Sequence, residues 1–272
     1  MTLDVSGASM HRPARSYPAM AADENRVEPC PRRIRGILNG QKVFDTTRAL
    51  YVWEWPGYPQ YHVPAPDVQR QFLMASEPRG EGSVGGAVPH DLQVGDVRRE
   101  RAVRVHPATG QPGLAGTVRF DWEALDAWFE EDEEVFVHPR NPYTRVDALR
   151  SRRHLRVEVA GVVLAETTAP VLLFETGLPT RYYLDKTAVR FEYLRPSDAR
   201  GSCPYKGDTS AYWSAELAGG VHGDVAWTYD FPTRELAPIA GLVAFFNEHV
   251  DLFLDGQPLR PESAPATSRR TR

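Results

Sequence analysis

The segment Ser202-Cys203-Pro204-Tyr205-Lys206-Gly207 holds the residues of this chain that are best suited to chemistry. Lys206 follows Cys203 by three positions, so a tight turn would bring its ammonium group towards the thiol and favour the reactive thiolate. Cys203 is therefore a candidate nucleophile. The alternative is a half-buried cysteine that closes a turn and does not react, and the spacing allows both.

Glu175 is a candidate partner of this segment, because it ends the apolar run Val171–Phe174 with a charge just before a turn at Thr176–Pro179. A carboxylate in such a place is either a buried hydrogen-bond acceptor or a general base. Both interpretations of Glu175 stay open.

Arg181 and Tyr183 alternate with Tyr182 in a predicted strand, so they share one face of a sheet. If Arg181 converges with Lys206, the two cations form a pocket for a carboxylate or a phosphate. The alternative is a solvated arginine on the surface of a sheet.

The elements that must position these residues occur twice in the chain. Residues 35–40 align with residues 156–161, and Tyr61-His62-Val63 aligns with Tyr182-Tyr183-Leu184, both at an offset of 121. A second block aligns residues 125–129 with 242–246, and residues 135–137 with 252–254, at an offset of 117. Two blocks in the same order predict a duplication.

Each copy is predicted to be a β-rich domain with one helix near its end. Alternating β-branched residues around a short turn predict a hairpin over 155–159 and 162–167. Further strands are expected over 171–174, 181–184, 211–217 and 224–229, with a turn at Gly219-Gly220. Apolar spacing predicts helices over 121–132 and 239–248, so that the acidic run Glu130–Glu134 would be a solvated helix end, with metal binding as the less favoured reading.

The predicted domains follow from this pattern and from the prolines in 138–143. Residues 1–33 and 259–272 are expected to be disordered tails, residues 34–140 the first copy and residues 141–258 the second copy. In the first copy, Gln60 and His62 replace Arg181 and Tyr183, and a glycine-rich stretch over 80–87 replaces the cysteine segment. The first copy is therefore expected to be a degenerate partner.

The composition of the chain argues against several classes of protein. The net charge of −4 among 272 residues argues against a general nucleic-acid binder, which needs a basic face. No apolar run approaches the roughly 20 residues of a membrane span, and two cysteines are too few for a disulfide framework. We expect a cytoplasmic protein whose partner is a small molecule, with no metal and no cofactor. The oligomeric state is left open.

The stretch Leu173–Tyr183, followed by Cys203–Gly207, Tyr212-Trp213 and Ala226–Tyr229, resembles the bacterial domain of unknown function 427 family. The resemblance covers about residues 35–256, to a tandem form of the family. It implies a mainly β (α+β) fold, in which each domain is β-tent-like, with two small antiparallel sheets that meet at an angle.

The resemblance also implies which side chains line the site. The family is sometimes labelled a nucleotidyltransferase, but the chain contains no nucleotidyltransferase motif. The expected catalytic residues are Cys203, Lys206 and Glu175. The expected substrate-binding residues are Arg181, Tyr183, Tyr205, Tyr212, Trp213 and Trp227. In the first copy only Glu54 and Tyr61 match clearly.

Three hypotheses remain at this stage. The protein is an enzyme that acts on a small polar or anionic molecule through Cys203, a non-catalytic module that binds a small ligand in an aromatic pocket, or a structural and interaction domain. The behaviour of Cys203 separates the first two, since only an enzyme of this kind needs a reactive thiol.

Overall fold

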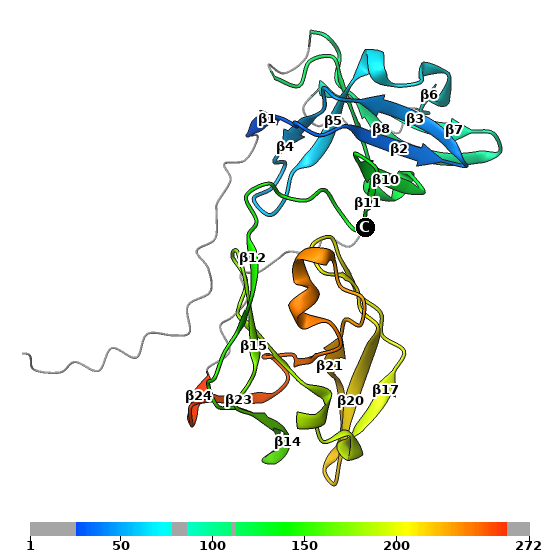
Figure 1. The fold of residues 1–272 in the computed structure, drawn as a ribbon. Helices are drawn as coiled ribbons and strands as arrows, with labels where there is room; N and C mark the ends of the chain where they lie inside the picture. Colours follow the sequence, from blue (N-terminus) through cyan, green and yellow to red (C-terminus); the bar gives the residue numbers. More distant parts are fainter. Residues whose placement is uncertain (1–25, 78–85, 110–112, 260–272) are drawn as a thin grey trace, which may run out of the picture. The chain divides into compact units, whose positions relative to one another are not determined.

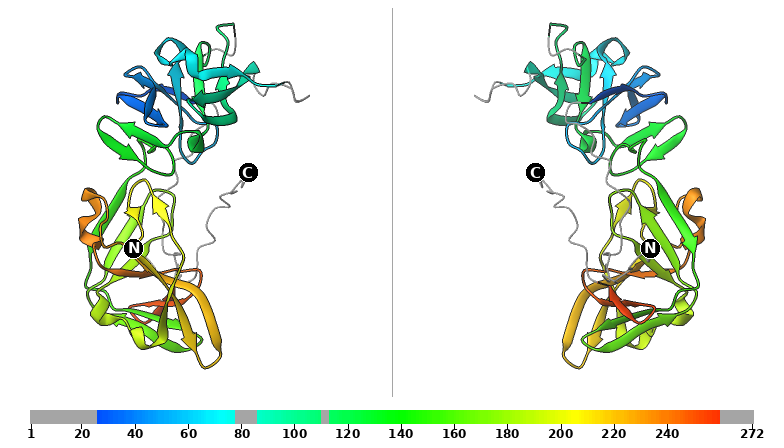
Figure 2. Two further views of the ribbon diagram at one scale, coloured as in Figure 1. Left: turned by 90° about the vertical axis from the view of Figure 1, so that its right-hand side faces the viewer. Right: turned by 90° about the vertical axis from the view of Figure 1, so that its left-hand side faces the viewer.

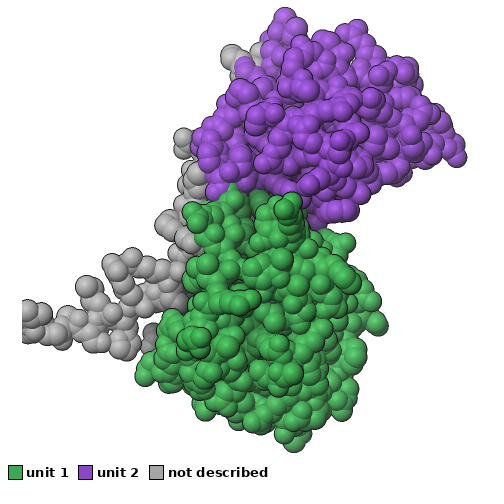
Figure 3. Space-filling view, in the orientation of Figure 1, with its two compact units in different colours: residues 1–20, 144–272 green, residues 21–143 purple. Residues whose placement is uncertain are grey.

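The computed structural model describes residues 26–77, 86–109 and 113–259. These residues form two compact units that divide between Tyr143 and Thr144 (Figure 3), three residues after the predicted domain boundary. We call residues 26–143 the first unit and residues 144–259 the second unit. Residues 260–272 of the predicted C-terminal tail and residues 80–85 of the glycine-rich stretch lie outside the described residues, whereas Leu259 ends the last strand of the second unit.

The first unit consists of two antiparallel sheets (Figure 1). The larger sheet has the strand order β1-β4-β5-β9-β8-β7-β6, and the smaller one the order β11-β10-β2-β3. Their bounds are Val27–Pro29 for β1, Ile34–Leu38 for β2, Gln41–Thr46 for β3, Leu50–Val52 for β4, Gln60–Pro64 for β5, Leu73–Ala75 for β6, Val88–Val94 for β7, Val97–Val105 for β8, Thr117–Phe120 for β9, Ala127–Glu130 for β10 and Glu133–Val135 for β11.

The second unit repeats this plan and includes the long β20–β21 hairpin (Figure 2). Its sheets have the orders β12-β15-β16-β22-β21-β20-β17 and β14-β13-β23-β24, with a small extra hairpin, β18-β19. The bounds are Val146–Arg150 for β12, Leu155–Val159 for β13, Val162–Thr167 for β14, Val171–Glu175 for β15, Arg181–Leu184 for β16, Leu194–Ser197 for β17, Ser202–Cys203 for β18, Gly207–Asp208 for β19, Ala211–Leu217 for β20, Gly220–Thr228 for β21, Val243–Phe245 for β22, Asp251–Leu254 for β23 and Gln257–Leu259 for β24.

Strand pairing confirms the duplication and the first aligned block. Leu50 pairs with His62 in the first unit, and Val171 pairs with Tyr183 in the second, so the offset of 121 holds across both strands. The hairpins that open the two small sheets also match. Asn39-Gly40 and Ala160-Gly161 both have positive φ at their two residues, as a type I′ turn requires.

The second block of the sequence alignment, at an offset of 117, pairs residues that are not structurally equivalent, so this prediction is wrong. His62 pairs with Arg119, whereas Tyr183 pairs with Ala244, so β22 corresponds to β9 and not to the stretch around Trp128. By the same reasoning β23 corresponds to β10. The true offset of 124 to 125 differs from the predicted 117 because similar apolar spacing recurs in neighbouring elements, and the sequence match paired the wrong ones.

The helices predicted over 121–132 and 239–248 are also wrong. Residues 127–130 form β10, a strand between β2 and β11, and residues 243–245 form β22, a strand between β16 and β21. Apolar residues three and four positions apart also suit a short buried strand, and pairing on both sides decides between the two. The helices that the structure describes are short 3₁₀ helices: Ala65–Asp67, Arg70–Phe72, Trp122–Ala124, Lys186–Ala188, Phe191–Tyr193 and Arg234–Ile239.

Glu130 is not part of a solvated helix end. It ends β10 with only 5% exposure, where it pairs with Arg32 and accepts a hydrogen bond from the Tyr61 hydroxyl. No group of acidic, histidine or cysteine residues within the described ranges could hold a metal ion. Of the acidic run, Glu130 therefore contributes a buried charge to the first unit, while residues 131–134 are exposed as predicted.

Residues at the start of the first unit are ordered, against the prediction of a tail through residue 33. β1 pairs with β4, and Cys30 is buried at 3% exposure. Residues 1–25 lie outside the described residues. No helix among the residues that the structure describes is long and apolar enough to cross a bilayer.

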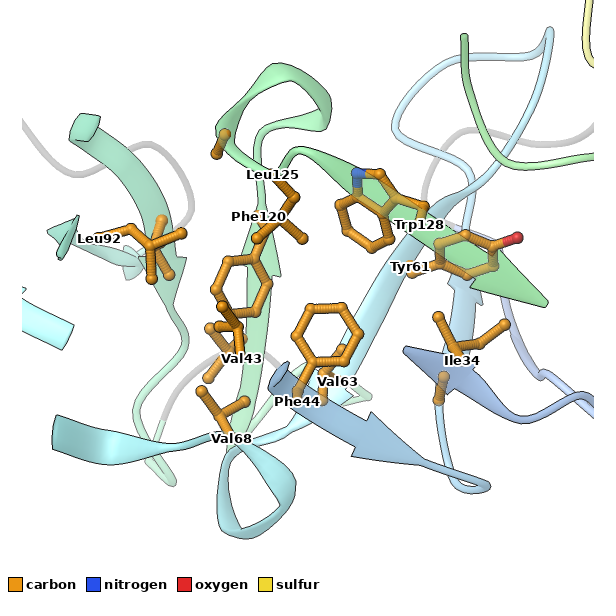
Figure 4. Packing of buried hydrophobic residues seen from close by; sticks show 14 of the residues in the cluster. Ile34, Val43, Phe44, Tyr61, Val63, Val68, Leu92, Phe120, Leu125 and Trp128 are labelled. Atoms are coloured by element: carbon orange, nitrogen blue, oxygen red, sulfur yellow. The ribbon is translucent and has the colours of Figure 1, made fainter. Parts of the chain in front are cut away.

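The core of each unit lies between its two sheets. In the first unit Phe44 packs on Phe120 and Trp128, with ring centroids 5.0 and 5.5 Å apart, and Tyr61 lies beside Trp128 (Figure 4). A single cluster of buried residues joins β2, β3, β5, β9 and β10 in this way. The second unit has a corresponding cluster and a further one on the outer face of its larger sheet.

Candidate functional site

The outer face of the larger sheet in the second unit gathers most of the predicted site residues. We call it the site face. Residues of β15 alternate between faces, so Val171, Leu173 and Glu175 share it. Hydrogen-bonded neighbours extend it across the sheet in one row, which consists of Val171, Tyr183, Ala244, Trp227 and Tyr212.

The cysteine segment is held against this face by the β18–β19 hairpin. The Lys206 amide donates to the Cys203 carbonyl oxygen at 3.3 Å, and Gly207 adopts φ of 91°, which favours glycine. The Thr233 hydroxyl donates to the Tyr205 carbonyl oxygen at 2.6 Å, and the Thr233 amide donates to that of Lys206 at 3.1 Å. The loop after β21 therefore fixes the turn that carries Lys206.

Lys206 and Glu175 form a buried ion pair. Lys206 Nζ lies 2.5 Å from Glu175 Oε2, and the side chains are only 13% and 9% exposed. Burial by itself would lower the pKa of Lys206, but the charge of Glu175, and less strongly that of Cys203, raises this pKa overall. Lys206 is therefore a permanent cation at neutral pH and a donor rather than a base.

Tyr183 lies beside this pair with an unused hydroxyl group. Its side chain is fully buried, and among the described residues its Oη finds no hydrogen-bond partner of good geometry. Burial raises the pKa of Tyr183 to about 12, against the opposing effects of Lys206 and of the Trp227 indole N–H, which lies near the phenol oxygen. The phenol is consequently protonated at neutral pH, and its proton has no acceptor.

Cys203 lies at the edge of the same cluster. It is a free, half-buried thiol in β18. Burial raises the pKa of the neighbouring Tyr229 phenol, and a negative charge on Tyr183 or Cys203 would raise it further. A negative charge on Cys203 would also raise the pKa of Lys206, so the thiol lies close enough to interact with this lysine.

Arg181 forms an ion pair with Glu248. Its guanidinium group binds Glu248 through two hydrogen bonds of 2.8 Å, and it lies over the rings of Trp227 and Phe246 at 5.7 and 5.9 Å. Arg181 and Lys206, the two cations of the predicted pocket, therefore each have a carboxylate partner, Glu248 and Glu175. Arg181 also contacts the aromatic part of the site.

Of the remaining predicted residues, Tyr212 and Trp227 belong to the site face and Trp213 does not. Trp213 packs with the core between the sheets, edge-on to Phe191 at 5.5 Å. Alternation along β20 explains this, since neighbouring residues 212 and 213 must point to opposite faces. Tyr205 is half-buried in the turn before Lys206.

Sequence reasoning missed three residues of the site face. Tyr229 follows Trp227 by two positions and could have been found from strand alternation. Phe246, whose ring centroid lies 4.3 Å from that of Trp227, and Glu248 were assigned to a helix. Their position beside β16 depends on the pairing of β22, which local sequence does not show.

The fold and the site define a class of protein with two duplicated β units, of which the second carries a buried lysine–glutamate pair beside a buried phenol. The chain belongs to the domain of unknown function 427 (DUF427) family, whose model matches residues 26–131 and 147–256. The two matches confirm the tandem resemblance. No curated protein is significantly similar to the chain.

Proposed function

We propose that the second unit binds a small polar molecule by an oxygen acceptor, either a carbonyl or a carboxylate group. The observation that carries this proposal is the buried Tyr183 hydroxyl, whose proton has no acceptor among the described residues. A buried polar group of this kind costs about 1 to 3 kcal/mol when it makes no hydrogen bond. A ligand oxygen at Tyr183 would recover that free energy on binding.

The groups around Tyr183 favour an acceptor over a donor. The phenol is protonated, and the Lys206 ammonium group has three N–H donors, of which one is given to Glu175 in the ion pair. The pair of Lys206 and Glu175 has no net charge. Both a neutral carbonyl and a carboxylate are therefore suitable ligands.

Aromatic rings supply the apolar part of the proposed site. The Trp227 ring lies edge-on to Tyr183, with centroids 6.2 Å apart, and Phe246 lies between Trp227 and Tyr212. Such rings contact the carbon skeleton of a small ligand while a few polar groups orient it. This combination supports a binding site for a small organic molecule.

The Tyr183→Phe variant tests the proposal, because it removes only the unused hydroxyl. We expect its stability to equal or exceed that of the wild type by about 1 kcal/mol. Acetate and acetamide, titrated while the indole N–H resonance of Trp227 is followed by NMR, should bind roughly tenfold more weakly to the variant.

Tyr182→Phe is the matched control, since Tyr182 faces the core between the sheets. This variant should keep the wild-type response of Trp227 to both probes. Equal affinity of wild type and Tyr183→Phe for acetate and acetamide would contradict the proposal.

A second candidate function is catalysis by the free Cys203 thiol, favoured by the tight turn that places Lys206 three residues after it, with the Lys206 amide bonded to the Cys203 carbonyl oxygen. Alkylation by iodoacetamide, mapped by mass spectrometry, distinguishes it from pure binding. An enzyme thiol should react at about pH 6 much faster than free cysteine, because the thiolate is the nucleophile. If Cys203 reacts no faster than free cysteine, the catalytic function is contradicted and ligand binding is the only proposed function that stands.

A further inference from the structure

The first unit has a cluster of buried polar groups at the place where the second unit has its site. Strand pairing puts His62 at the position of Tyr183, and Glu54 four residues after Leu50 matches Glu175 four residues after Val171. The row across the sheet, apolar and aromatic in the second unit, here consists of Leu50, His62, Arg119 and Arg104. The two units therefore share the glutamate, whereas the residues around it differ.

Three nitrogen atoms in this cluster are buried and make no hydrogen bond within the part of the chain that the structure describes. Among the described residues, His62 Nε2, His106 Nδ1 and Arg119 Nε have no hydrogen-bond partner. Glu54 Oε1 lies 3.6 Å from His62 Nε2 and 3.4 Å from Arg119 Nε. His62 and His106 lie side by side, with ring centroids 5.1 Å apart.

The hydrogen bonds of Thr117 determine which nitrogen of His62 carries the proton. The Thr117 hydroxyl donates its only proton to the Leu114 carbonyl oxygen at 2.6 Å. Its oxygen lies 3.2 Å from His62 Nδ1 and can only accept there, so Nδ1 carries the imidazole proton. His62 Nε2 is then an acceptor, and its distance of 3.6 Å from Glu54 Oε1 is too long for a hydrogen bond of good geometry.

Burial keeps His62 in this neutral form. Burial lowers the pKa of His62, and Arg119 adds to this effect, while Glu54 opposes it. His106 also has a pKa lowered by burial and by His62. The cluster therefore offers two kinds of group to a ligand, the acceptors His62 Nε2 and Glu54 and the donor Arg119 Nε.

The charges of the cluster cancel. Arg119 and Arg104 both bind Asp121, and Arg119 also faces Glu54. Two cations and two anions leave no net charge for a charged ligand to neutralise. An amine ligand would be repelled by the Arg119 guanidinium group, and a carboxylate ligand would be repelled by Glu54.

The cluster is buried at its base and open at its rim. His62 is 1% exposed and His106 8%, whereas the side chains of Glu54 and Arg104 are 42% and 44% exposed. Glu54, whose Oε1 lies 3.6 Å from His62 Nε2, therefore links the buried nitrogen to the exposed rim of the cluster.

We propose that the first unit is a second ligand site, which binds a small uncharged molecule through a carboxamide, ureido or lactam edge. The N–H groups of such an edge would donate to His62 Nε2 and Glu54, and its carbonyl oxygen would accept from Arg119 Nε. Without a bound molecule, these three buried nitrogen atoms make no hydrogen bond to any described residue, and folded proteins rarely leave buried polar atoms in that state. A metal ion is disfavoured because Arg119 contacts the carboxylate.

NMR of the full chain labelled with ¹⁵N in its histidine rings tests this site, with acetamide as the probe. The His62 signals are assigned by their loss in His62→Gln. We expect Nδ1 protonated and Nε2 unprotonated at about pH 7, and a saturable shift of Nε2 on addition of acetamide. Acetate, which has no N–H donor, should leave Nε2 unchanged.

Two variants probe the ligand contacts. Glu54→Gln and Arg119→Lys should each weaken the acetamide response of His62 roughly tenfold, the loss expected for one hydrogen bond to a charged group. Using both keeps the test valid if one of them unfolds the unit. Glu175→Gln, the matched change in the second unit, should leave the response of His62 intact.

A protonated Nε2 in the wild type would overturn the proposal. So would the lack of a saturable shift with acetamide, or an equal shift with acetate. Retention of the full response in both variants would contradict the assigned contacts in the same way.

Discussion

Replacing Lys206 with methionine removes one partner of the buried ion pair and leaves the volume of the side chain nearly unchanged. Lys206 Nζ and Glu175 Oε2 are 2.5 Å apart, and neither side chain is more than 13% exposed. The variant therefore leaves the Glu175 carboxylate buried beside an apolar thioether. We expect a large loss of stability, confined to the second unit.

The size of this loss follows from the burial of the pair. Two charges about 4 Å apart attract each other by about 4 kcal/mol at an effective dielectric constant of about 20. Removal of one partner from a buried pair typically costs about 3 to 5 kcal/mol, because the remaining charge stays desolvated. The double variant Lys206→Met with Glu175→Met leaves no charge, and should recover at least about 2 kcal/mol of that loss.

Hydrogen exchange in increasing urea, read by mass spectrometry, measures this loss for each unit separately. Peptides from β15, β16 and β21 should exchange at lower urea in Lys206→Met, while peptides from β4, β5 and β8 serve as the internal control. A loss below about 1 kcal/mol, or a double variant no more stable than the single one, would refute the reasoning.

Two other predictions concern His62 and Arg181. Because the folded-state pKa of His62 is lowered, the unfolded chain binds more protons below its ordinary pKa of about 6.5, so the first unit should lose stability as the pH falls through that value. The loss on going from about pH 7 to pH 5, followed by urea unfolding, should be smaller in His62→Gln, and an equal loss would contradict the assignment. Arg181→Lys should destabilise the second unit by about 1 kcal/mol, since lysine cannot make both hydrogen bonds to Glu248 or lie flat on Trp227; an unchanged unfolding midpoint would refute this.

The local sequence was sufficient to predict the hairpins and many of the strands. Ala160-Gly161, with strand-forming residues on both sides, predicts a tight hairpin, and the structure confirms one there. The failures lie where one apolar pattern suits two structures. Trp128 and Phe245 lie in central strands because partners far along the chain pair on both sides of them, and this information is absent from a window of ten residues.

The sequence predicts which residues belong to the site better than it predicts the ion pairs that these residues form. Strand alternation correctly separates Tyr183 from Tyr182, and the segment around Lys206 does lie near Glu175. The partner of Arg181 could not be predicted, because Glu248 is 67 positions away and reaches it only through the pairing of β16 with β22. Ion pairs of this kind depend on the packed fold rather than on spacing.

The two proposed sites make opposite demands on a ligand, although they occupy equivalent places. Tyr183 offers a proton, whereas His62 Nε2, at the matching position, needs one. The cation also comes from different elements, from the β18–β19 hairpin in Lys206 and from β9 in Arg119. Acetate can satisfy the first demand and not the second, so it should shift the Trp227 resonance and leave His62 unchanged. A common response of both residues to acetate would mean that the units did not diverge in specificity, and it would remove the reason for assigning them different ligands.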